Sequence, residues 1–254
     1  MFLALLKLSP VFLSLTQLVL YKILVATRAG WQWYLILILG LDLAYFILLK
    51  IKLKPEHLVW LALHSLIVVT SGFAFLLITH DWLFVNAFIV SWSLVYFFYL
   101  ESIFHYYYES RKQVLFNIQN VISYTNLIAF FLINATLYNF YIFIEIGWWW
   151  ILIINLIASY ILLINYYLVN QVNWQDLLVY SSVIVLIILE VVAGLIFWPV
   201  SFYVLTLIVT LSYYVLSSLS LLYWQEKLTA IHIWQYTGFT LIILGLVLLT
   251  TIWL

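Results

Sequence analysis

The sequence predicts an all-α, polytopic bundle of about nine transmembrane helices. Hydrophobic residues make up 68% of the 254-residue chain and charged residues only 7%, whereas a soluble domain has about 25% charged residues. A soluble fold with so few charges could not cover its surface, but lipid accepts apolar side chains. Two further observations support this fold class. Nine apolar stretches have the length of a bilayer crossing, and most Lys and Arg residues fall on one side of them.

The apolar stretches set the number of spans. A helix needs about 20 mostly apolar residues to cross the hydrocarbon core. The first span is the weakest of the nine, because Pro10, Gln17 and Lys22 lie in or beside it, and a bundle of eight spans is the alternative. No repeat or linker divides the chain, so we expect a single transmembrane domain over residues 1–254. The expected spans are residues 8–27, 31–49, 57–78, 82–104, 118–138, 147–168, 176–197, 200–222 and 230–253.

The breaks between the spans contain residues that end helices or leave lipid. The longest connection, residues 101–117, is polar enough to leave the bilayer. The aromatic stretch 138–146 is expected to lie in the interface, where the three tryptophans at 148–150 form an anchor. A tight turn is expected at Trp198 and Pro199, because proline cannot continue the preceding helix. The first three breaks fall at residues 28–30, 50–56 and 80–81.

The basic residues predict the orientation. Lys and Arg are enriched in cytoplasmic loops of membrane proteins. With nine spans, seven of the nine basic residues fall on the side of the amino terminus, which is therefore predicted to be cytoplasmic. These are Lys7, Lys50, Lys52, Lys54, Arg111, Lys112 and Lys227, and the other side holds Lys22 and Arg28.

Several functional classes are excluded or disfavoured by what the sequence lacks. The net charge is zero, so there is no basic surface for nucleic acid. Cysteine is absent, which excludes thiolate metal sites and cysteine nucleophiles. No HExxH, GxSxG or glycine-rich phosphate loop is present. We therefore expect no metal and no cofactor, and the missing motifs disfavour an enzymatic function.

Asp42 and His64 are the first pair of ionisable residues within the spans. Asp42 lies seven residues before the end of its span near Leu49, and His64 lies seven residues after the start of its span at His57. The two spans form an antiparallel hairpin, so both side chains should lie at a similar depth and could pair. This pair predicts either a proton or cation site or a structural hydrogen bond between the helices.

Glu190 is the second ionisable residue at membrane depth, about eight residues before the Trp198 turn. Asn134 and Asn155 come from the same half of neighbouring spans and could solvate its carboxyl group. A polar track from Glu190 to Asp42 would suit a proton-coupled transporter. The alternative is a neutral glutamic acid that hydrogen-bonds across helices.

Glu101, His105 and Glu109 form the third polar group, at the cytoplasmic interface. Their spacing of four residues places them on one face of a helix. Such side chains can bind zinc. However, three ligands on one helix extend over two turns, about 11 Å, too far to touch one ion. A solvated interfacial face is favoured over a metal site.

The carboxyl-terminal third resembles a family of bacterial multi-pass membrane proteins to which no activity is assigned. Glu190 and Trp253 are part of the resemblance, together with Phe-Trp-Pro-Val at 197–200, Tyr-Tyr-Val-Leu-Ser at 213–217 and Lys-Leu-Thr at 227–229. The chain departs from the family at 230–232, where Ala-Ile-His replaces basic residues. The resemblance implies a bacterial inner membrane.

These observations lead to three functional hypotheses. The first is a non-enzymatic scaffold or subunit of a membrane assembly, surrounded by lipid and associated with other membrane proteins or with further copies of itself. The second is a small proton- or cation-coupled transporter that uses Asp42, His64 and Glu190. The third is an intramembrane lipid-modifying enzyme that uses Glu101, His105 and Glu109. A cavity that joins Asp42, His64 and Glu190 would favour transport, whereas a packed interior with an exposed polar or small-residue groove would favour a partner.

Overall fold

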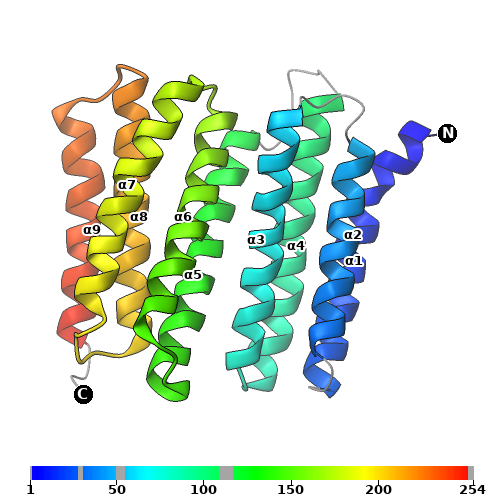
Figure 1. Ribbon diagram of the computed structural model, residues 1–254, viewed down its shortest axis with the longest axis horizontal. Helices are drawn as coiled ribbons and strands as arrows, with labels where there is room; N and C mark the ends of the chain where they lie inside the picture. The colour runs from blue at the N-terminus through cyan, green and yellow to red at the C-terminus, as the bar shows by residue number, and fades with distance from the viewer. Residues whose placement is uncertain (1, 28–30, 50–54, 109–116, 251–254) are drawn as a thin grey trace. The chain divides into compact units, whose positions relative to one another are not determined.

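The computed structural model describes residues 2–27, 31–49, 55–108 and 117–250, which form nine α-helices and no strand (Figure 1). Each helix is long and apolar enough to cross a membrane, so the protein is a multi-pass integral membrane protein. The helices are α1 (Phe2–Thr27), α2 (Trp31–Leu49), α3 (Pro55–Ile78), α4 (Trp82–Tyr108), α5 (Ile118–Ile144), α6 (Trp148–Val169), α7 (Trp174–Leu195), α8 (Phe202–Trp224) and α9 (Ala230–Thr250).

Three of the described helices, α1, α4 and α5, extend beyond the predicted spans by about a turn or more. Helix α4 continues to Tyr108, beyond the predicted end of its span at residue 104, in agreement with the helix expected for Glu101 and His105. Helix α5 continues to Ile144 and includes most of the predicted interfacial stretch. Helix α1 begins at Phe2, which places Pro10 inside it. Hydropathy marks the segment that lipid can surround, whereas the backbone hydrogen bonds of a helix continue into the interface.

The chain divides into two compact units. The amino-terminal unit, Met1–Ala129, contains α1 to α4 and the first part of α5, and the carboxyl-terminal unit, Phe130–Leu254, contains the rest. In the amino-terminal unit, α1 packs against α2 and α4, and α2 packs against α3. In the carboxyl-terminal unit, α6, α7, α8 and α9 pack in succession. The single domain over residues 1–254 stays a prediction from the sequence.

A close approach between α3 and α4 depends on a glycine. A Cβ atom added to Gly72 of α3 would lie only 2.0 Å from Nε1 of Trp92 on α4. The Trp92 side chain is buried and stacks on Phe88, with 6.1 Å between the ring centroids. Any larger residue at position 72 must therefore displace a packed indole ring.

The connections in the carboxyl-terminal unit are short, as predicted. Helix α7 ends at Leu195 and α8 begins at Phe202, so the predicted break at Trp198 and Pro199 is confirmed. Gln171 and Glu226, at the ends of α6 and α8, adopt positive φ values of 61° and 55°. The amide groups that follow them bond to carbonyl groups five residues earlier, at 3.1 Å and 2.9 Å. These are the αL termini that satisfy the last carbonyl groups of a helix.

Candidate functional site

Asp42 is held inside the amino-terminal unit by two hydroxyl groups. It lies on the buried stripe of α2 and is 1% exposed. The hydroxyl group of Ser65 on α3 donates to Asp42 Oδ1 at 2.7 Å, and the hydroxyl group of Tyr96 on α4 donates to the same atom. The second carboxyl oxygen, Oδ2, has no hydrogen-bond partner among the residues that the structure describes. The hydrogen bonds of Oδ1 therefore join three helices, whereas Oδ2 remains able to accept a hydrogen bond or carry a proton.

His64 has its own partners and does not pair with Asp42. Its Nδ1 lies 2.8 Å from the Tyr99 hydroxyl group, and its Nε2 contacts Oδ1 of Asn126 on α5. A neutral imidazole satisfies both contacts, with Nε2–H donating to Asn126 and Nδ1 accepting from Tyr99. The predicted Asp42–His64 pair is thus wrong. Ser65, the next residue on α3, faces Asp42 in place of His64.

Asp42 and His64 nevertheless lie in one polar layer across the amino-terminal unit, as their equal offsets from the helix ends predicted. Adjacent aromatic rings connect their partners. The Tyr96 and Tyr99 ring centroids are 6.4 Å apart, and those of His64 and Tyr99 are 5.0 Å apart. Sequence reasoning missed the residues that hold this layer: Ser65, Tyr96, Tyr99 and Asn126. An asparagine inside an apolar span was a signal for Asn126, but nothing singled out two tyrosines among 20.

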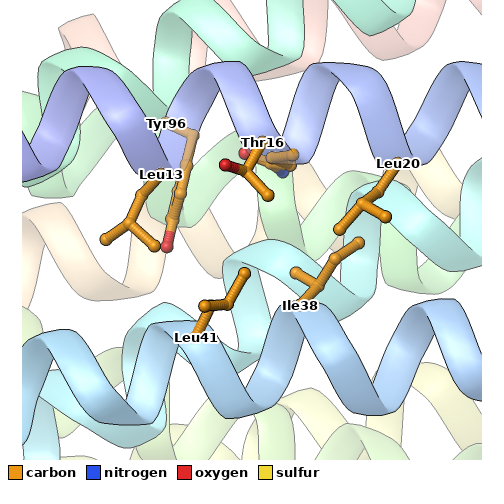
Figure 2. A pocket seen from close by; sticks show the side chains of 7 residues that line it. Leu13, Thr16, Leu20, Ile38, Leu41 and Tyr96 are labelled. Carbon is orange, nitrogen blue, oxygen red and sulfur yellow. The ribbon is translucent and has the colours of Figure 1, made fainter.

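A pocket lies beside this layer, between α1 and α2. It is small, with a volume of about 10 Å³, roughly the room that one water molecule needs. Figure 2 shows Leu13, Thr16 and Leu20 of α1 facing Ile38 and Leu41 of α2, with the Tyr96 side chain of α4 reaching into the space between them. Gln17 also lines the pocket. The pocket is therefore lined in part by the buried Tyr96 side chain, which bonds to Asp42.

Gln17 adds a second unpaired acceptor near this pocket. Its Nε2 donates to the Tyr21 hydroxyl group at 3.0 Å, and that hydroxyl group donates to the Val69 carbonyl group at 2.7 Å. Gln17 Oε1 is buried without a hydrogen-bond partner in the described part of the chain. Gln17 and Tyr21 therefore join α1 to α3, although the sequence marked Gln17 as a weakness of the first span.

Glu190 contrasts with Asp42, because its side chain is exposed on α7. Asn134 and Asn155 are fully buried and donate to carbonyl groups of their own helices, at Phe130 and Ile151. The prediction that these two asparagines solvate Glu190 is therefore wrong. The predicted polar track also fails at Glu190, because its carboxyl group does not face the core of its unit. A charged side chain is costly within the hydrocarbon region, most of all at its centre, so a partner for Glu190 would be favourable.

Glu101 and His105 bond to each other near the end of α4. His105 Nε2 lies 2.8 Å from Glu101 Oε1, and both side chains are partly exposed. This agrees with the predicted common helix face, whereas Glu109 lies outside the described residues. Within the described ranges, no group of three or more His, Asp or Glu side chains is placed to hold a metal ion.

Comparison with known proteins found no match: no family model, no curated protein and no solved structure resembles the chain significantly. The resemblance of the carboxyl-terminal third to a bacterial membrane family therefore stays a prediction. Two features of the structure bear on function. One is the polar layer around Asp42 and His64 in the amino-terminal unit, and the other is the exposed carboxyl group of Glu190 on α7.

Proposed function

We propose that the protein is a non-enzymatic subunit or scaffold of a membrane assembly. The observation that carries the proposal is the exposed carboxyl group of Glu190 within a membrane-spanning helix. Ionisable side chains in transmembrane helices usually face the bundle interior or pair with one another. Glu190 faces outward and has no hydrogen bond or ion pair among the described residues. A neighbouring protein can supply the partner that this chain does not.

Helix α9 gives independent support, because it leaves most of its surface uncovered. Thr240 is the only buried residue between Ala230 and Leu249. A Cβ atom added to Gly238 or Gly245 would meet nothing within 4 Å, so the backbone is accessible at two positions of α9. Small residues let transmembrane helices approach closely. The proposed location is a bacterial inner membrane with the amino terminus in the cytoplasm, which the basic residues and the family resemblance support.

The test is the size of the protein in its native membrane patch. We expect each polymer nanodisc that holds the tagged full chain to contain a protein mass well above the 30.0 kDa of one chain, once the mass of lipid and polymer is subtracted. Glu190→Gln removes the charge at membrane depth and should shift the protein toward the monomer. Glu226→Gln removes the same charge from the exposed α8–α9 connection and should leave the size unchanged. A monodisperse, partnerless wild-type protein would contradict the proposal.

A proton- or cation-coupled transporter is the second candidate, and the unpaired Asp42 Oδ2 near the α1–α2 pocket favours it. Asp42→Asn keeps the size of the side chain and removes its titratable proton. If the candidate is right, this variant should abolish cation-dependent proton flux into liposomes, measured with a trapped pH-sensitive dye. Asp81→Asn is the matched control, because Asp81 caps α4 outside the spans and asparagine caps equally well. Equal flux through wild type and Asp42→Asn would reject transport through this site.

A further inference from the structure

Lys22 is an exposed basic residue on an apolar face of α1. The side chains around it on this face are also exposed, including Leu15 and Val19 at 55% and 52%. Lys22 has no ion pair or hydrogen bond among the residues that the structure describes. Helix α1 packs against α2 and α4 through its other side, where Gln17, Tyr21 and Leu24 are buried. The face that carries Lys22 is therefore directed to lipid or to another protein.

Glu190 has a closely similar setting on α7. Val183 and Leu186 are exposed on the same face, at 54% and 58%, and Phe197 in the turn after α7 is 83% exposed. One turn after Glu190, a Cβ atom added to Gly194 would meet nothing within 4 Å. The face thus combines an acidic group with a backbone position that a second helix can approach closely. The acidic group and the accessible backbone of this α7 face suit a second helix that carries a basic residue.

The offsets of the two charges from their helix ends predict matching depths in the membrane. Lys22 is five residues before Thr27, where α1 ends, and Glu190 is five residues before Leu195, where α7 ends. Both are therefore roughly 8 Å from the ends of their helices. Consecutive spans cross a membrane in alternate directions, so the span count predicts that the first and the seventh cross it in the same direction. Trp31 and Trp198 follow the two helix ends, as expected for residues at one interface.

We propose that α1 of one copy packs against α7 of a second copy, with Lys22 paired to Glu190 in the same leaflet. This inference rests on the proposed function and names the partner as another molecule of the same chain. Charge complementarity at equal depth favours this occupant over an unrelated helix. The contact joins two different faces, so it repeats from copy to copy and builds a closed ring or an open row.

Charge reversal in mixed populations tests the inference. We expect Lys22→Glu alone and Glu190→Lys alone to weaken self-association about tenfold or more, because each places like charges opposite each other. Self-association is measured by energy transfer between fluorescent copies diluted in liposomes. Mixing the two single variants makes every α1–α7 contact between unlike copies complementary, so energy transfer between them should return. The double variant, Lys22→Glu with Glu190→Lys, should also recover. Lys227→Glu, which reverses a charge outside the spans, is the control for net charge.

The outcomes separate this inference from the proposed function. Recovery in the double variant but not in the mixture would mean that the charges pair within one chain, and it would overturn the inference. Association that no charge reversal affects would also overturn it while leaving a membrane assembly in place. A wild-type protein that neither self-associates nor binds another membrane protein would contradict both. Because the chain has no cysteine, Lys22→Cys mixed with Glu190→Cys gives an independent cross-linking test. The expected product is a dimer.

Discussion

Replacing Gly72 with alanine is expected to lower the free energy of unfolding of the amino-terminal unit by about 1–3 kcal/mol, the usual cost of overpacking a core. The added methyl group would lie 2.0 Å from Nε1 and 2.3 Å from Cδ1 of Trp92. The indole ring cannot simply rotate away, because it is 2% exposed and stacked on Phe88. Reversible unfolding in mixed micelles, with a denaturing detergent titrated against a mild one, would measure the change.

Gly40→Ala is the matched control for this prediction. Gly40 lies inside α2 of the same unit, and a Cβ atom there would meet nothing within 4 Å. Alanine is a better helix former than glycine, so this variant should be neutral or slightly more stable. Shortening Trp92 to valine in the Gly72→Ala background should also cost less than the two single changes added together. Equal stability of Gly72→Ala and Gly40→Ala would show that α3 and α4 do not approach as described.

Replacing His64 with leucine is expected to destabilise the same unit by about 1–3 kcal/mol, the cost of leaving a buried polar group unsatisfied. His64 is fully buried, and its ring joins Tyr99 of α4 to Asn126 of α5. Leucine has a similar volume but offers no donor to Asn126 Oδ1 and no acceptor to the Tyr99 hydroxyl group. The same unfolding experiment measures the loss, and a conserved helical circular dichroism signal would show that the fold persists.

His57→Leu provides the comparison, because His57 lies two turns earlier on α3 and is only half-buried. The change in stability should be small there. A second variant, Asn126→Leu combined with His64→Leu, removes both members of the contact and should recover part of the loss. If His57→Leu and His64→Leu have the same effect, the hydrogen bonds of His64 contribute nothing measurable to stability.

The two units use ionisable groups at membrane depth in different ways. In the amino-terminal unit, Asp42 and His64 form hydrogen bonds with side chains of neighbouring helices, so they contribute to packing within the unit. In the carboxyl-terminal unit, Glu190 faces outward and no described residue bonds to it. This difference supports a scaffold more than a transporter, because a transport path needs its ionisable groups along one interior route.

The sequence alone determined the class of the protein, its nine spans and most of the breaks between them. These properties depend on sums over many residues: about 20 apolar residues make a span, whatever their order. The equal offsets of Asp42 and His64 placed them in one polar layer, because depth follows from the rise along a helix. The predicted fourth and fifth spans end too early, since residues 105–108 and 139–144 continue the helices although they are polar or interfacial in composition.

Only the tertiary structure decided which partner each polar side chain takes. One residue along a helix turns a side chain by about 100°, so Ser65 faces Asp42 while its neighbour His64 faces Tyr99 and Asn126. Hydropathy treats Glu190 and Asp42 alike, as single acids in apolar helices, yet one is exposed and the other buried. The face that a transmembrane helix turns inward depends on its contacts with other helices, because lipid is as apolar as the core and gives no hydrophobic preference for either face.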